Sequence, residues 1–153
     1  MTSFVQYECL IKPRTTILPS EQILIERLRA EQQRGAFRAH SCSIDDLQAI
    51  EILEKRNKLG KGELSSIAFA MKIHQGFITD DMKAWRLAKD AGHPYSQTTP
   101  HLFSWLIFTG RLGDSDKDIV ISQHVEAGRH IAQHLQTAYE MALQCRLNST
   151  VRA

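Results

Sequence analysis

The stretch from Leu59 to Lys89 constrains the fold of this chain more than any other part. It opens with a loop marked by Gly60 and Gly62. Apolar residues then recur at the helical period, which predicts an amphipathic helix over 62–75. The short apolar run at 77–79 is typical of a strand, and a second helical pattern follows it. The stretch therefore predicts a helix, a strand that returns along it, and another helix.

Three carboxylates should meet at one end of this unit. Glu63 lies in the first turn of the predicted helix, and Asp80 and Asp81 directly follow the strand. The helix rises about 20 Å, and the strand with its turn retraces roughly 10–17 Å of that length. Acidic side chains gathered in this way either bind a hard metal ion or cap helix N-termini, and the spacing alone leaves both readings open.

Four cations precede and enter the same helix: Lys55, Arg56, Lys58 and Lys61. Positive charge beside a carboxylate cluster suits a phosphate-bearing substrate held against a divalent metal. The net charge of +2 is only mildly basic and does not by itself indicate a nucleic-acid partner.

The whole-chain composition indicates an ordinary soluble globular protein. A length of 153 residues suffices for one domain with a real core. Three scattered cysteines do not form a disulfide framework, so we expect reduced thiols in a cytoplasmic protein. The sequence contains neither a membrane-length apolar run nor a signal-peptide pattern.

The remaining patterns predict mainly helices. We expect helices over 3–11, 20–34, 44–57, 99–109 and 115–147, a strand over 36–42 and a weak strand within 91–98. The predicted buried positions are Ile23, Leu24, Leu28, Ile67, Ala68, Met71 and Ile78.

The predicted C-terminal helix carries Glu126, His130 and His134 at a spacing of four residues. Such a face can bind zinc, but the glutamate of the H-E-x-x-H motif is missing. A polar helix face is therefore the favoured interpretation, and a helical regulator that binds metal through the two histidines is the weaker alternative.

The segment GELSSIAFAMKIHQGFITDDMKAWRLAK resembles the C-terminal half of PIN-domain ribonucleases, the fold of many toxins of bacterial toxin–antitoxin pairs. In this resemblance Glu63 matches the acid of the helix and Asp81 matches the acid of the turn. Asp80 stands where the family often has asparagine. FVQYECLIKPR is similar to an earlier helix of the family, whose glutamate would be Glu8. The resemblance covers roughly residues 3–109.

The resemblance implies an α/β fold, helix-rich and three-layered, with a small parallel sheet. It implies a PIN-like domain over 1–110, with a helical extension over 111–153 packed on it. The family's first strand and the aspartate that ends it have no counterpart in the sequence. We therefore expect the PIN-like domain to be N-terminally incomplete and its activity to be impaired.

The resemblance also implies a Mg²⁺- or Mn²⁺-dependent ribonuclease. Glu8, Glu63 and Asp81 would be catalytic acids that hold the metal, with Asp80 assisting, and the four cations would contact RNA. An antitoxin protein and a second copy of the chain are further expected partners, and no membrane partner is expected. The alternative is a non-catalytic interaction module with a degenerate PIN-like fold.

Overall fold

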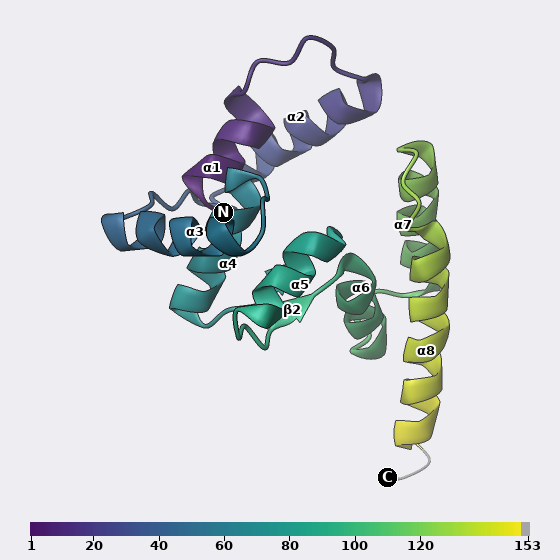
Figure 1. Cartoon of the computed structure of the whole chain (residues 1–153). Coiled ribbons are helices and arrows are strands. Elements are labelled where there is room, and N and C mark those ends of the chain that lie inside the picture. The colour runs from purple at the N-terminus through teal and green to yellow at the C-terminus, as the bar shows by residue number, and fades with distance from the viewer. Residues whose placement is uncertain (151–153) are drawn as a thin grey trace. The chain divides into compact units, whose positions relative to one another are not determined.

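The computed structural model describes the backbone of residues 1–150 and the side chains of residues 1–149. Helices dominate it, and its small parallel sheet makes the fold broadly α/β, as predicted (Figure 1). The helices of the described residues are α1 (Ser3–Gln6), the π-helix η1 (Tyr7–Ile11), α2 (Pro19–Gln33), α3 (Ile44–Arg56), α4 (Lys61–Ile73), α5 (Met82–Asp90), α6 (Thr99–Phe108), α7 (Asp114–Glu126) and α8 (Ala132–Thr150). The strands are β1 (Phe77–Ile78) and β2 (Ser96–Gln97).

The chain divides into two compact units between Gln97 and Thr98. The boundary expected from the sequence lies later, at residue 110. The difference arises because α6 buries Phe103 and Ile107 in a cluster with residues of α8, and so belongs to the second unit. The boundary between the two units therefore follows the apolar packing of α6, and not the end of the domain implied by the family resemblance.

The core of the first unit forms around α4. Leu64, Ile67 and Ala68 of this helix are buried in one cluster with residues of α3, β1 and α5. The predictions for Ile67 and Ala68 are confirmed, and Met71 packs partly buried against the same cluster. The prediction for Ile78 is wrong, because the strand turns Phe77 into the core and leaves Ile78 47% exposed.

The backbone pairing in this unit is parallel and short. β1 pairs with β2 in the register Phe77 with Ser96. The strand predicted over 36–42 reduces to a single parallel bridge between His40 and Thr2. Phe37 has a left-handed backbone, with φ of 50°, which interrupts the extended conformation that a longer strand would need.

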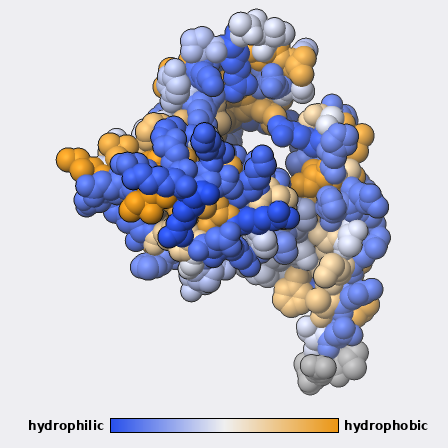
Figure 2. All heavy atoms as spheres, viewed as in Figure 1, coloured by the Kyte–Doolittle hydropathy of each residue, from blue (hydrophilic) through white to orange (hydrophobic). Residues whose placement is uncertain are grey.

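Helix α2 contains no fully buried residue. Of the three positions predicted to be buried on it, Ile23 and Leu24 are therefore wrong. Ile23 and Leu24 are both about half exposed, whereas Leu28 is half-buried. Figure 2 shows apolar side chains at the surface over the start of α2 and of α3. Leu18 and Ile44, the most exposed of these positions, have exposed fractions of 58% and 75%.

The second unit contains three helices among its described residues. α6 and α8 pack through Phe103, Ile107 and Leu135, with α7 alongside α8. The single long helix predicted over 115–147 is wrong. It breaks after Glu126, where Gly128 adopts a φ of 65°, a conformation that favours glycine and ends a helix.

This break also removes the predicted histidine face. Glu126 ends α7, His130 lies in the connection, and His134 belongs to α8. The spacing of four residues has meaning only on one continuous helix, so the three side chains do not share a helix face.

No helix over residues 1–150 is both long and apolar enough to cross a bilayer. The thiols of Cys9, Cys42 and Cys145 are free, as expected for a chain without a disulfide framework.

Candidate functional site

The first turn of α4 places Glu63 at the start of the helix. Gly60 is the N-cap residue, and its N–H donates to Glu63 Oε2 at 3.0 Å. This contact satisfies a backbone donor that the helix itself leaves unpaired. Glu63 therefore lies in the first turn, as the sequence predicted, with its side chain folded back along the loop.

Glu8 reaches the same turn from the N-terminal helices. It belongs to η1, a π turn in which the Lys12 N–H donates to the Tyr7 carbonyl at 2.7 Å. Glu8 Oε1 accepts a hydrogen bond from the Gly62 N–H at 3.2 Å. π turns within helices are rare and occur often at functional sites. The sequence indicated a helix here but gave no sign of the π turn.

A buried hydroxyl pair fixes this arrangement. Thr2 Oγ1 and Ser65 Oγ lie 2.7 Å apart, and both residues are almost fully buried. Ser65 also donates to the Gly62 carbonyl at 2.9 Å. Because the Thr2 side chain caps α1 as well, the start of α1 is tied to the first turn of α4.

Gly62 is required for the position of the Glu8 carboxylate. A Cβ at residue 62 would lie 2.2 Å from Glu8 Oε2 and 2.9 Å from its Cδ, which is far too close. Gly60 is different, because a Cβ there would lie 3.5 Å from Glu63 Oε2 and 3.9 Å from Glu8 Oε1. One oxygen of each carboxylate therefore lies within 4 Å of the same position beside Gly60.

The oxygens of this pair suit a hard cation. Glu8 uses Oε1 and Glu63 uses Oε2 for backbone N–H groups, and no hydrogen bond within the described residues engages the other oxygen of either group. Mg²⁺ is commonly bound through one or two carboxylates, with water completing its coordination. The Glu8–Glu63 pair therefore has the donor chemistry that Mg²⁺ or Mn²⁺ requires.

Asp81 acts as the N-cap of α5. Its Oδ1 accepts from the N–H groups of Lys83 at 2.7 Å and Ala84 at 3.0 Å, while Asp80 precedes it in an exposed turn. No group of three or more His, Cys, Asp or Glu side chains over residues 1–149 is placed to hold a metal ion. The structure brings Glu8 and Glu63 together, and the participation of Asp80 and Asp81 stays a prediction.

Most of the predicted RNA-contacting cations have partners in the structure. Lys55 pairs with Glu51 at 2.8 Å and Lys61 pairs with Glu54, while Arg56 donates to the Asp90 carbonyl at 3.5 Å. Exposed ion pairs of this kind contribute roughly 0–1 kcal/mol, so a phosphate can compete with them. Lys58 is exposed.

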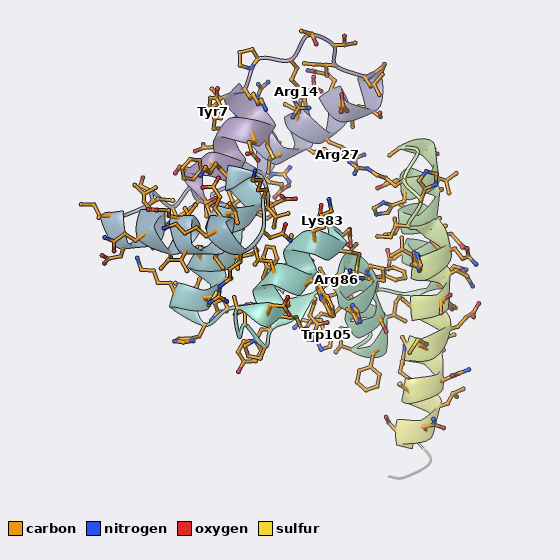
Figure 3. All side chains as sticks on the ribbon, in the orientation of Figure 1. Tyr7, Arg14, Arg27, Lys83, Arg86 and Trp105 are labelled. Carbon is orange, nitrogen blue, oxygen red and sulfur yellow. The ribbon has the colours of Figure 1, made fainter. Side chains whose placement is uncertain are left out.

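Two cations that the sequence analysis did not single out lie on α5. Lys83 and Arg86 are exposed and one helical turn apart, and Figure 3 shows Lys83 near the start of the helix. The Lys83 N–H donates to the carboxylate of Asp81, the N-cap residue. The apolar pattern of this segment of the sequence could have indicated these two positions. Ala84, Leu87 and Ala88 form the buried face of α5, which leaves 83 and 86 on the solvent side.

The pKa of the Cys9 thiol is affected by burial and by the neighbouring Glu8 carboxylate. Burial first, and then the neighbouring Glu8 carboxylate, raise the pKa of the Cys9 thiol above its ordinary value. Arg14 opposes this effect, and its guanidinium donates to the Glu8 carbonyl at 3.3 Å. The thiol is thus kept protonated next to an acidic group, which makes it a poor nucleophile.

The resemblance to PIN-domain ribonucleases rests on the quoted sequence motifs alone. No protein-family model, curated protein or solved structure gives a significant match to this chain.

Proposed function

We propose that this chain is a PIN-like, metal-dependent ribonuclease that hydrolyses RNA phosphodiester bonds. The observation that carries the proposal is the meeting of Glu8 and Glu63 at the first turn of α4, from positions 55 residues apart in the sequence. Each carboxylate accepts a hydrogen bond from a different N–H group of this turn through one oxygen, which leaves the second oxygen of each for a cation.

The proposed roles follow from the oxygens that remain available. Glu8 and Glu63 supply ligand oxygens for Mg²⁺ or Mn²⁺, and Asp81, assisted by Asp80, is the further acid. A bound divalent ion would activate water and neutralise charge on the scissile phosphate. The exposed Lys58, Lys83 and Arg86 are candidates for contacts with the RNA backbone.

The finer description of the fold belongs to the same proposal. A three-layer PIN-like domain with an incomplete sheet accounts for the parallel β1–β2 pair and for the separate parallel bridge at Thr2. The proposed biological role is that of a toxin in a toxin–antitoxin pair.

A second candidate function is a non-catalytic protein-interaction module. Helix α2 favours it, because this helix buries no residue while Ile17, Leu18, Ile23 and Leu24 are all exposed by more than two-fifths. An apolar helix surface of this kind suits contact with another protein, such as an antitoxin or a second copy.

RNA cleavage distinguishes the two functions. The assay follows single-turnover cleavage of a mixed RNA pool with Mn²⁺ and with a chelator. We expect weak, chelator-sensitive cleavage that is lost in Glu63→Gln and in Asp81→Asn. Glu140→Gln is the matched control, since this exposed glutamate of α8 lies in the second unit and pairs with Gln136.

Cleavage that persists equally in Glu63→Gln would come from another source and would contradict the nuclease proposal. No chelator-sensitive cleavage by any form of the chain would favour the interaction module.

A further inference from the structure

The π turn that carries Glu8 cannot pair its last carbonyl groups by itself. In a π turn, each carbonyl accepts from the N–H group five residues further on. The Lys12 N–H fills this place for the Tyr7 carbonyl, at 2.7 Å. The Glu8 carbonyl would need the N–H of the next residue, which is Pro13 and has none. The carbonyls that end this turn therefore need donors from outside it.

Two arginines supply these donors. Arg14 Nη2 donates to the Glu8 carbonyl at 3.3 Å and to the Cys9 carbonyl at 3.4 Å. Arg29 Nη2 donates to the Leu10 carbonyl at 3.4 Å. Guanidinium groups from two different segments thus hold three consecutive carbonyls of the turn. Positive charge at a helix C-terminus is also favoured by the helix dipole.

The contact made by Arg29 links α2 to the proposed site. This helix contains no fully buried residue, and it packs against η1. Arg14 and Arg29 are both exposed, so the loss of either side chain should leave the fold intact. The consequence of their contacts lies in the geometry that they impose on the turn.

This geometry determines where the Glu8 carboxylate lies. The N-terminal end of the segment is fixed by the Thr2–Ser65 hydroxyl contact of 2.7 Å, and the two arginines hold the other end. Between them, Glu8 Oε1 accepts from the Gly62 N–H at 3.2 Å. A π turn and an α-helical turn place successive side chains at different angles, so rewinding the turn would redirect Glu8.

We propose that Arg14 and Arg29 are positioning residues of the proposed metal site. They hold η1 in its π turn, and the π turn directs the Glu8 carboxylate to the first turn of α4. Each guanidinium acts through a backbone carbonyl. The inference rests on the proposed function, because the direction of Glu8 affects chemistry only where a cation binds. It makes the affinity for the metal depend on α2, which carries none of the proposed ligands.

The Mn²⁺ affinity of the full chain tests this inference, because charge and position predict opposite signs. A positive side chain near a cation site repels the cation, so by charge alone its removal would strengthen binding. We expect Arg14→Ala instead to weaken Mn²⁺ binding about tenfold, as the loss of groups that orient metal ligands commonly does. Arg29→Ala should weaken binding by a smaller factor, since its carbonyl lies two residues beyond Glu8. Electron paramagnetic resonance of the free ion measures both affinities.

Arg27→Ala is the matched control for the loss of charge. Arg27 is also an exposed arginine of α2, and residues two apart on a helix face different sides (Figure 3). Among the described residues, no hydrogen bond joins Arg27 to η1. Its replacement should change the Mn²⁺ affinity by less than about twofold, because solvent and salt screen an exposed charge.

The amide NMR signal of Gly62 shows the position of Glu8 without any metal. The Gly62 N–H donates to Glu8 Oε1, so Glu8→Ala should shift this signal upfield. Arg14→Ala should shift it in the same direction, and Arg27→Ala should leave it in place. A merely structural role of Arg14 would lower the urea midpoint without moving the Gly62 signal.

Two results would overturn the inference. The first is Mn²⁺ binding by Arg14→Ala that is as tight as that of the unmutated chain. The second is a Gly62 signal that stays in place in both Arg14→Ala and Arg29→Ala. Failure of the proposed function is distinguishable, because Glu63→Gln would then leave the Mn²⁺ affinity unchanged. In that case the Gly62 signal alone decides whether the arginines position Glu8.

Discussion

Replacement of Gly62 by alanine tests how the Glu8 carboxylate is held. The new Cβ would lie 2.2 Å from Glu8 Oε2, so the side chain of Glu8 must leave the first turn of α4. The hydrogen bond from the Gly62 N–H is then lost, and a bond to a charged group contributes about 1.5–3 kcal/mol. We take the lower end because Glu8 is only half-buried.

The opposing effect is the higher helix propensity of alanine, which contributes about 0.5–1 kcal/mol. Gly62→Ala should therefore lower the free energy of unfolding by about 0.5–1 kcal/mol. In a Glu8→Ala background only the propensity effect remains, so the same substitution should raise that free energy by about 0.5–1 kcal/mol. The sign of the effect should reverse, which a double-mutant cycle by urea denaturation measures.

Gly60→Ala is the matched control. Its Cβ would meet the two carboxylates at ordinary distances, and Gly60 has a φ of −61°, which alanine adopts readily. We expect a change within about 0.5 kcal/mol, because the smaller loss of unfolded-state entropy offsets the poorer N-cap. If Gly62→Ala stabilised the chain equally with and without Glu8, the carboxylate would not occupy this turn.

Three further predictions concern stability and reactivity. Ile67→Ala should lower the free energy of unfolding by about 2–4 kcal/mol, measured by urea denaturation, because Ile67 is fully buried; an unchanged midpoint would contradict this. The Lys72 ammonium holds the pKa of Asp46 below its ordinary value of 3.8, so the ionised form contributes stability above about pH 4 that is lost as the pH falls. Asp46→Asn should flatten this acid limb in thermal unfolding, and an unaltered limb would refute it. Iodoacetamide at pH 8 should modify the half-buried Cys9 more slowly than the exposed Cys145, and equal rates would show that burial and Glu8 do not suppress the thiolate.

Local patterns predicted most of the first unit. The capping signal at Ser43 and the glycines before α4 fixed the starts of α3 and α4 to within about one residue, since caps are set by neighbouring residues. The same signals placed Glu63 in the first turn of α4. The contact between Glu8 and Gly62 spans 54 residues and was not predicted, although the family resemblance implied that Glu8 lies near Glu63.

The errors arose where distant packing or a single backbone angle decides the structure. Ile78 has strand chemistry, but a two-residue strand with an unpaired edge leaves it half exposed. Gly128 ends α7 through one left-handed angle, although the apolar pattern continues beyond it. Lys55 pairs with Glu51 within α3 at the i, i+4 spacing, whereas the pairing of Lys61 with Glu54 depends on the turn between α3 and α4.

Manganese binding at the first turn of α4 is the most direct test of the proposed site. In NMR spectra of the full chain, Mn²⁺ should broaden the amide signals of Gly62 and Glu63 at concentrations well below those that affect the exposed Glu140 of α8. Glu63→Gln should remove this selective broadening, and Glu140→Gln should leave it unchanged. Broadening that is uniform over the surface acids, or that persists in Glu63→Gln, would contradict a metal site formed by Glu8 and Glu63.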